Sequence, residues 1–217
     1  MSKLAGRFIV FDGPDGSGKS SQFRRFSSLA EQMSGIDVCE VREPGGTSIG
    51  EQIRDILLNP ENVEMDLTTE MLLYMASRAQ LVSQRIKPAL MSGQLVLADR
   101  FISSTLAYQG TAGGVSLDGI RAVGNIVCEE VSPDLVVLFD VDLQTAAHRL
   151  NPLLDRMEAK GAEFHERVRH GFLNQAQHDP DTYLVIDATH SEQEVFTTLL
   201  DQMAHFFESK PIHSHNG

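Results

Sequence analysis

The sequence predicts an α/β fold in which helices cover both faces of a parallel sheet. Short apolar runs alternate along the chain with longer segments whose apolar residues recur at helical spacing, which is typical of strand-helix-strand units. The short runs are rich in β-branched and aromatic residues and are apolar on both faces, as expected for strands between two helix layers. A glycine-rich segment between the first run and the first helical pattern also fits such a unit.

Five strands are expected, at 8–11, 38–41, 95–98, 135–139 and 184–186. Helical patterns fill the intervals between them, and the longest runs over 69–92, where we expect Pro88 to bend or interrupt the helix. Three sets of apolar residues each share one helix face, and we expect the polar remainder of each helix to face water. The sets are Ile49, Ile53, Ile56 and Leu57; Leu117, Ile120, Val123, Val127 and Val131; and Val195, Leu199, Met203 and Phe207. The face over 117–131 fits either the core or a contact between two copies, and the sequence does not decide between them.

Length and charge limit the class of protein. The chain has 217 residues, 41% of them hydrophobic, and neither a linker nor a repeat divides it, so we expect one domain over 1–217. The 18 basic and 30 acidic residues give a net charge of −12, which argues against binding to nucleic acid or anionic membranes, because both require a basic face.

The sequence favours a cytoplasmic location. No apolar run is long enough to span a bilayer, and the N-terminal segment leads into a strand pattern rather than a signal peptide. Cys39 and Cys128 have no metal-ligand spacing, so we interpret both as core residues in a reducing compartment. We expect residues 209–217 to form a disordered tail.

Residues 13–20 read GPDGSGKS and fit the pattern G-x-x-x-x-G-K-[ST]. The glycines allow the backbone to approach a phosphate chain, and the N-terminus of the following helix directs N–H groups at the phosphate oxygens. Lys19 adds a mobile cation, and Ser20 adds a hydroxyl for Mg²⁺. The segment therefore predicts a binding loop for a nucleoside triphosphate, commonly called a P-loop.

Three arginines lie where a second ligand is expected. Arg42 and Arg100 follow the second and third predicted strands, and Arg78 lies on the long helical pattern. Ligands of open α/β sheets bind at the carboxyl ends of the strands. The arginines therefore predict a second phosphate or base site, as in a kinase whose acceptor is itself phosphorylated. The N-K-x-D motif of a GTPase does not occur in the sequence.

Three further segments resemble those of one enzyme family. They are REPGGT at 42–47, DRF at 99–101 and SSTLAYQG at 103–110. They are similar to the R-E-P-G-G-T, D-R-[YHF] and S-x-x-A-Y-Q-G segments of bacterial thymidylate kinases, members of the P-loop nucleoside monophosphate kinase family. The resemblance runs in order from about 8 to 207. It implies a three-layer P-loop kinase fold with a five-stranded parallel sheet, a short lid at about 149–160 and a homodimer.

The resemblance also implies the reaction ATP + dTMP ⇌ ADP + dTDP with Mg²⁺ and assigns residues to it. Implied catalytic residues are Lys19, Asp15, Arg100 and Arg156. Implied ATP-binding residues are Gly13, Pro14, Asp15, Gly16, Ser17, Gly18, Lys19, Ser20, Ser21, Arg149, Asp187 and Ala188. Implied dTMP-binding residues are Asp15, Arg42, Pro44, Tyr74, Arg78, Arg100, Ser104, Thr105, Tyr108 and Gln109. Ser20 and Asp99 are implied as metal-binding residues.

Within the dTMP site, the resemblance implies that Tyr74 stacks on thymine and that Arg78, one helical turn later, donates to a thymine carbonyl. Ser104, Thr105 and Gln109 are implied to read the base edge. Tyr108 is implied to crowd the sugar 2′ position, and Arg42 and Arg100 to clamp the phosphate.

The predicted lid departs from the family pattern. No cation lies between Arg149 and Arg156, and positions 14–17 of the P-loop are not basic either. Arg156 is therefore the candidate for stabilising the transferring phosphoryl group. We interpret Arg167 and Arg169 as structural, and His165 and His170 as facing solvent.

Two alternatives remain open at this stage: a kinase of another nucleoside monophosphate such as dUMP, and a catalytically weak nucleotide-binding regulator with a cation-poor lid.

Overall fold

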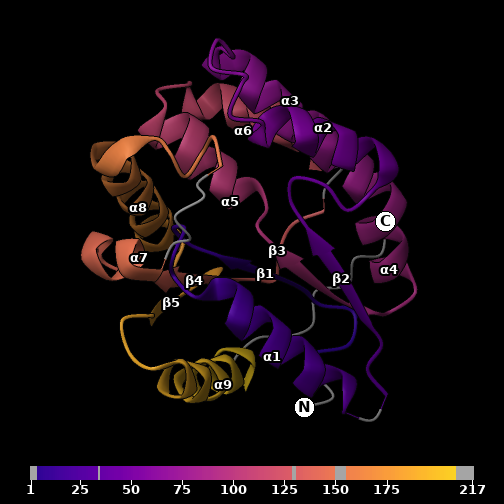
Figure 1. Ribbon diagram of the computed structural model, residues 1–217. Coiled ribbons are helices and arrows are strands. Elements are labelled where there is room, and N and C mark those ends of the chain that lie inside the picture. The colour runs from indigo at the N-terminus through magenta and orange to yellow at the C-terminus, as the bar shows by residue number, and fades with distance from the viewer. Residues whose placement is uncertain (1–3, 34, 129–130, 150–154, 209–217) are drawn as a thin grey trace.

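The computed structural model describes residues 4–33, 35–128, 131–149 and 155–208. Its centre is a five-stranded parallel sheet with the order β2-β3-β1-β4-β5 and helices on both faces (Figure 1), which confirms the predicted fold class. The strands are β1 (Phe8–Asp12), β2 (Val38–Arg42), β3 (Leu95–Asp99), β4 (Leu135–Asp140) and β5 (Tyr183–Asp187). Each strand ends one residue later than predicted, at a charged residue, so the carboxyl edge of the sheet is lined with charge.

The two faces of the sheet form separate cores because side chains alternate along each strand. Ile9 and Phe11 of β1 pack with α1 (Lys19–Glu31) and α9 (Glu192–Glu208) on one face. Phe8 and Val10 pack on the opposite face, against the helices that follow β2. The predicted apolar face of α9 is confirmed, because its residues Val195, Leu199, Met203 and Phe207 are all buried.

The prediction that all five strands are apolar on both faces is wrong for the edge strands β2 and β5. Glu40 of β2 is exposed, and 41% of the surface of Val185 of β5 is accessible. Each edge strand has one neighbour in the sheet, so the helix layers cover it less completely. For the same reason Cys39 of β2 is only half-buried. Cys128 is also half-buried and packs against the core rather than within it.

The long helical pattern before β3 forms three consecutive segments, α3 (Leu67–Leu81), the π-helical η1 (Val82–Ile86) and α4 (Lys87–Met91). Pro88 has no N–H to donate, and its ring would clash with the carbonyl of Gln84 in a regular α-helix. The wider π turn ahead of Pro88 relieves this conflict. The predicted interruption is therefore confirmed as a change of helix type without a break.

Helices α2 (Ser48–Leu58) and α6 (Leu117–Cys128) lie on either side of α3. The apolar faces of both helices are only partly buried. Leu57 and Ile120 are buried, but Ile49 and Ile56 of α2 are about half exposed, and Leu117 is 36% exposed. Val131, assigned to the same face, follows the end of α6. Val131 is partly buried against the core, whereas Ile49, Ile56 and Leu117 remain accessible to solvent.

The remaining elements complete the layer that carries the candidate site. They are α5 (Ile102–Thr105), the π-helical η2 (Leu106–Ala112), α7 (Leu143–Arg149) and α8 (Gly161–His178). Helix α8 packs closely on η2. Within the described ranges, no helix has the length and apolar character needed to cross a bilayer. Residues 150–154 of the predicted lid and the tail 209–217 lie outside the described residues.

Candidate active site

The P-loop follows β1 and leads into α1, as predicted. Gly13, Gly16 and Gly18 have φ values of 147°, 78° and 79°, which favour glycine. A Cβ at Gly13 would lie 2.5 Å from the carbonyl oxygen of Phe139, and one at Gly16 would lie 2.5 Å from that of Ala146. Two of the glycines are therefore required by close backbone contacts as well as by their backbone conformation.

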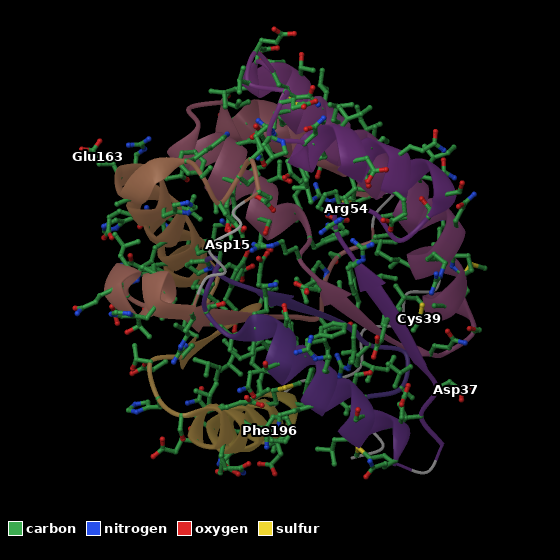
Figure 2. All side chains as sticks on the ribbon, in the orientation of Figure 1. Asp15, Asp37, Cys39, Arg54, Glu163 and Phe196 are labelled. Atoms are coloured by element: carbon green, nitrogen blue, oxygen red, sulfur yellow. The ribbon has the colours of Figure 1, made fainter. Side chains whose placement is uncertain are left out.

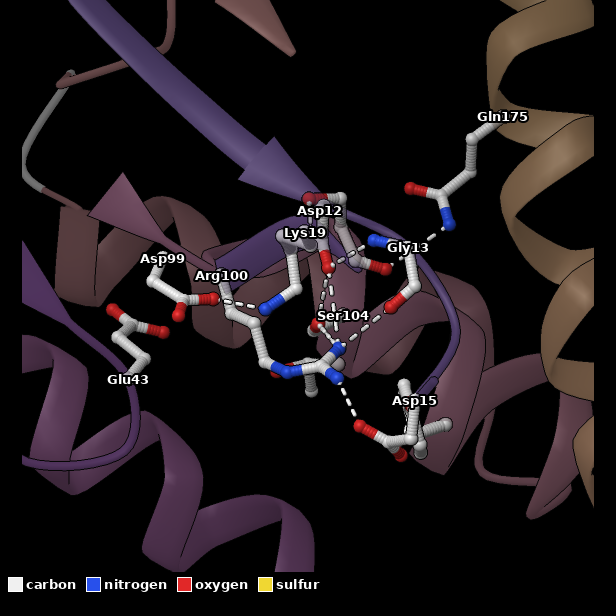
Figure 3. Close-up of polar contacts among 12 residues, drawn as sticks. Asp12, Gly13, Asp15, Lys19, Glu43, Asp99, Arg100, Ser104 and Gln175 are labelled. Atoms are coloured by element: carbon white, nitrogen blue, oxygen red, sulfur yellow. Dashed lines mark hydrogen bonds and ion pairs between the residues drawn. The ribbon is translucent and has the colours of Figure 1, made fainter. Parts of the chain in front are cut away.

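Lys19, the first residue of α1, forms an ion pair with Asp99 at the end of β3 (Figure 3). Lys19 is nearly buried. Burial alone would raise the pKa of the Asp99 carboxyl, but the nearby Lys19 and Arg100 outweigh burial, so this pKa lies below its ordinary value. The pair places a cation and a carboxylate beside the P-loop.

Arg100, the residue after β3, is held over the P-loop by several acceptors (Figure 3). Its Nη2 pairs with Asp15, and its Nη1 donates to the carbonyl of Gly13 and to Ser104 Oγ, both at 3.0 Å. Nη1 also lies 3.3 Å from a carboxylate oxygen of Asp12. These contacts fix the guanidinium before any ligand arrives.

Asp12 is a site residue that sequence reasoning missed. It is fully buried and accepts hydrogen bonds from the N–H of Gly13 and from the hydroxyls of Ser103 and Ser104. Because it also faces Arg100, it connects β1 with α5. The available signal was its position, a carboxylate at the end of an apolar strand and directly before the glycine motif.

Asp15 lies between the predicted donor and acceptor sites. Besides Arg100, it accepts a hydrogen bond from the hydroxyl of Tyr108 at 2.7 Å. Burial would raise the pKa of the Asp15 carboxyl, but Arg100 and the Tyr108 hydrogen bond outweigh it and lower the pKa below its ordinary value. Asp15 is therefore ionised at neutral pH.

A cleft next to the P-loop brings together all ten residues implied for dTMP. In Figure 2, the labels of Asp15 and Arg54 lie toward the middle of the molecule, whereas that of Glu163 lies at its outer edge. Arg54 and Glu43, which the sequence interpretation did not assign, also line this cleft. The ten are Asp15, Arg42, Pro44, Tyr74, Arg78, Arg100, Ser104, Thr105, Tyr108 and Gln109.

Arg42 and Arg78 reach this cleft with different partners. Arg42 forms an exposed ion pair with Glu51 at 2.8 Å. Arg78 is fully buried, and its Nε and Nη2 both donate to Glu43, while Nη2 also donates to Thr105 Oγ1 at 3.0 Å. Glu43 thus fixes Arg78 in place, a role that its position in the R-E-P-G-G-T segment did not reveal.

A second cleft runs along the P-loop and contains most of the residues implied for ATP. It is lined by residues 14–21 together with Arg149 and Ala188, and Arg149 Nη1 donates to the carbonyl of Ala188 at 2.8 Å. Gly13 and Asp187 do not line it. The carboxylate of Asp187 accepts hydrogen bonds from Thr189 instead. The two clefts share Asp15, Lys19, Ser20, Arg100 and Glu158.

Arg156 lies apart from the other implied catalytic residues. Its Nη1 forms an ion pair with Glu70 of α3 at 2.7 Å, and its Nε donates to the carbonyl of Leu57 at 2.7 Å. Lys160 and Gln109 also donate to Glu70, at 3.1 and 2.8 Å. Sequence reasoning did not identify Glu70 or Lys160. The role of Arg156 at the phosphates stays a prediction.

The interpretation of α8, the helix that follows the predicted lid, is confirmed in part. Arg169 forms an ion pair with Asp140 at 2.7 Å, and Arg167 donates to the carbonyl of Ala112, so both contacts are structural as expected. His170 is exposed. His165, expected to face solvent, is half-buried, and its Nε2 lies 3.1 Å from the carbonyl oxygen of Glu158, because α8 turns it toward the P-loop side.

Comparison with known proteins identifies the family. The family model described as thymidylate kinase matches residues 11–199. A thymidylate kinase from Exiguobacterium sp. is 43% identical over 200 residues, which cover 91% of this chain and 94% of that one. One from Pelotomaculum thermopropionicum is 44% identical over 200 residues, covering 91% and 92%. The crystal structure of thymidylate kinase from Ehrlichia chaffeensis superimposes with a TM-score of 0.77 at 30% identity, covering 92% and 99%. The chain belongs to the thymidylate kinase family.

Proposed function

We propose that the protein transfers the γ-phosphoryl group of ATP to dTMP and releases ADP and dTDP. The observation that carries this proposal is the junction of the two clefts. One cleft contains all ten residues implied for dTMP, the other follows the P-loop, and both include Asp15, Lys19, Ser20 and Arg100. Two phosphorylated ligands in these clefts would meet beside Lys19 and Arg100, whose positive charges would stabilise the negative charge of the phosphates.

The chemistry requires positioning and charge stabilisation more than a strong base. An oxygen of the acceptor phosphate attacks the γ-phosphorus, and the bond from that phosphorus to the oxygen bridging to ADP breaks. The attacking oxygen is already ionised, so no proton has to be removed. Lys19 and Arg100 line both clefts, whereas Arg42 lines only the cleft assigned to dTMP, which we call the acceptor cleft. We assign Lys19 and Arg100 to the phosphoryl oxygens and Arg42 to the acceptor phosphate.

Ser20 and Asp99 are the residues that would hold Mg²⁺, which would neutralise phosphate charge when bound. The donor set fits. Mg²⁺ in such sites uses one or two protein oxygens and takes the rest from phosphates and water. Among the described residues, no three His, Cys, Asp or Glu side chains gather in a protein-only metal cage. Ser20 is exposed, and the carboxylate of Asp99 is ionised because Lys19 and Arg100 favour its charged form despite burial.

The base and sugar would occupy the part of the acceptor cleft farthest from the P-loop. We assign Tyr74 to stacking on the thymine ring and Arg78, Thr105 and Gln109 to its polar edge. Tyr108 is nearly buried, and its hydroxyl is bonded to Asp15. A fixed ring at this position would leave little room for a 2′-hydroxyl group and would favour deoxyribose.

We also propose that the protein acts in the cytoplasm as a homodimer. Ile49 and Ile56 of α2, Leu67 and Leu72 of α3, and Ile126 of α6 are between 36% and 75% exposed. Helix α3 packs against both α2 and α6, so these apolar side chains gather on neighbouring helices (Figure 1). Such a surface supports pairing with a second copy.

Substitution of Lys19 tests the proposed transfer. Lys19→Ala removes the P-loop cation, and we expect kcat for dTDP formation to fall about 100-fold or more, because such cations stabilise charge that develops on the phosphates. The control is Arg24→Ala, which removes an exposed cation from the same helix and leaves kcat unchanged. Circular dichroism checks that both variants are folded. Near-normal turnover of folded Lys19→Ala would exclude this role.

A further inference from the structure

Glu70 lies behind the base end of the acceptor cleft, on α3 and one turn before Tyr74. It is fully buried and does not line the cleft. Its carboxylate accepts hydrogen bonds from Gln109 Nε2 at 2.8 Å, Arg156 Nη1 at 2.7 Å and Lys160 Nζ at 3.1 Å. Glu70 therefore does not touch a ligand in the cleft, and of the three residues that donate to it, Gln109 is the one that lines the cleft.

The charge of Glu70 determines how the Gln109 amide is oriented. Burial would raise the pKa of the Glu70 carboxyl, but the Gln109 hydrogen bond, Lys160 and Arg156 outweigh it, so the pKa is lowered and the group is ionised at neutral pH. An ionised carboxylate accepts hydrogen bonds and cannot donate one. Gln109 must therefore turn its amide nitrogen to Glu70 and its carbonyl oxygen to the cleft. In the described part of the chain, no side chain donates to that oxygen.

The cleft wall beside Gln109 carries hydrogen-bond donors. Arg78 directs its Nε and Nη2 to Glu43 and Thr105. Among the residues that the structure describes, the sulfur of Met75 is the one acceptor of its Nη1, so an Nη1 N–H is left for a ligand. The Thr105 hydroxyl accepts from Arg78 and is free to donate its own proton. The wall thus presents donors next to the single carbonyl acceptor of Gln109.

The arrangement of hydrogen-bond donors and acceptor on the cleft wall complements one class of pyrimidine. A 4-oxo pyrimidine such as thymine presents a carbonyl acceptor next to the N3–H donor, which complements the wall. A 4-amino pyrimidine such as cytosine presents an amino donor next to an N3 acceptor, which is the reverse pattern. Buried polar groups left unpaired or opposed by a like group are costly, so a fixed wall rejects the second class strongly.

We propose that Glu70 is a positioning residue that sets base specificity, because it locks the Gln109 amide with its carbonyl oxygen toward the cleft and so selects 4-oxo over 4-amino pyrimidine nucleotides. This inference rests on the proposed function for the place of the base. It deepens that function by assigning the selection to a residue that does not touch the substrate. Gln109 makes the contact, and Glu70 decides which end of its amide is offered.

The test compares dTMP and dCMP as substrates of Glu70→Gln. A glutamine at position 70 can donate as well as accept, so the Gln109 amide is free to turn over and present its nitrogen to the cleft. We expect the kcat/KM ratio of dTMP over dCMP to fall about tenfold or more, with part of the change a gain for dCMP. Glu70→Asp keeps an acceptor-only group and should retain more of the wild-type ratio.

A double variant with balanced charge separates the effect of Glu70 on the orientation of the Gln109 amide from its effect on the stability of the protein. Glu70→Gln leaves Arg156 and Lys160 without their counterion, whereas Glu70→Gln combined with Lys160→Gln removes one charge of each sign. The matched control, Lys160→Gln alone, keeps Glu70 and should keep the wild-type ratio. If the double variant lowers activity on both substrates by the same factor and leaves the ratio unchanged, Glu70 has only a structural role and the proposal is wrong.

Binding measurements keep this inference distinct from the proposed reaction. Calorimetry gives the dissociation constants of dTMP and dCMP without any turnover, and the same loss of preference is expected in Glu70→Gln. Wild-type protein that binds dTMP over dCMP but forms no dTDP would contradict the proposed reaction and leave the role of Glu70 intact. Wild-type protein that forms dTDP but binds dCMP as tightly as dTMP would contradict the role of Glu70.

Discussion

Arg100 has a left-handed backbone conformation, with φ 73°, that residues with side chains rarely adopt. Such a conformation costs about 1 to 3 kcal/mol and persists only where its surroundings hold it. Here Asp12, Asp15, Ser104 and the carbonyl of Gly13 hold the guanidinium. The conformation directs the side chain of the residue after β3 back over the P-loop, between the two clefts.

Individual residues also mark the limit of sequence-based prediction. The residues Tyr74, Arg78 and Gln109, which the resemblance implied for dTMP, all line the acceptor cleft. The acidic residues that hold Arg78 and Gln109 in place were missed. Glu43 and Glu70 are isolated acidic residues in the sequence, and only tertiary structure reveals that each is buried against an arginine. Pairing across 35 or more positions leaves no local pattern that a sequence could display.

Arg156→Ala tests the lid cation at the residue scale. In the present structure Arg156 contacts Glu70, so it would have to leave this partner to reach the transferring phosphoryl group. If it does, we expect kcat to fall about 100-fold or more, since an arginine in this role contributes orders of magnitude. Arg121→Ala, which removes an exposed arginine of α6, should not change kcat. A kcat for Arg156→Ala within about threefold of wild type would show that the charge comes from another group.

At the scale of elements, motif context predicted structure better than apolar periodicity did. The strand, P-loop and helix succession at 8–31 formed as expected because glycine positions, strand end and helix start agree with one another. Periodicity in α2 and α6 identified apolar faces but not what covers them. A helix face that meets the core and one that meets a partner have the same spacing in sequence.

Gly16→Ala tests the P-loop as an element, with Gly93→Ala as its control. Both glycines have φ near 78°, so both alanines incur the same backbone strain of about 1 to 2 kcal/mol. A Cβ at Gly16 would lie 2.5 Å from the carbonyl oxygen of Ala146, whereas one at Gly93 meets nothing within 4 Å. We therefore expect Gly16→Ala to weaken ATP binding at least tenfold and Gly93→Ala to leave it unchanged, as measured by calorimetry. Equal ATP affinity in the two variants would contradict the steric role of Gly16.

At the scale of the whole molecule, the distribution of charge matters more than its sum. The net charge is −12, yet Lys19, Arg42, Arg54, Arg78 and Arg100 all line the acceptor cleft. Five acidic residues line the same cleft and balance these cations: Asp15, Glu43, Asp99, Asp155 and Glu158. A cleft with balanced charge repels a mononucleotide less than the acidic remainder of the surface does. The sequence interpretation placed Arg156 among these cations, whereas the structure places it on Glu70.

Ile126→Asp tests the proposed homodimer. Ile126 is 75% exposed on α6, so a charge there should leave the monomer fold intact and disrupt an apolar contact between two copies. We expect wild-type protein to sediment as a dimer and Ile126→Asp as a monomer. Met91→Asp is the control, because Met91 is 74% exposed but lies on α4, outside the α2, α3 and α6 surface. Two variants that sediment alike would exclude this surface as the interface.

The most direct test of the account is a comparison of acceptors with ATP and Mg²⁺. Wild-type protein is assayed with dTMP, dUMP, dCMP, dAMP and dGMP, and nucleoside diphosphate formation is measured. We predict the highest kcat/KM for dTMP, a value for dUMP lower by about 10- to 200-fold because only a methyl contact is lost, and values for the other three lower by about 10⁴-fold. A higher kcat/KM for any of the other acceptors, or binding of ATP and dTMP without formation of dTDP, would contradict the proposed function.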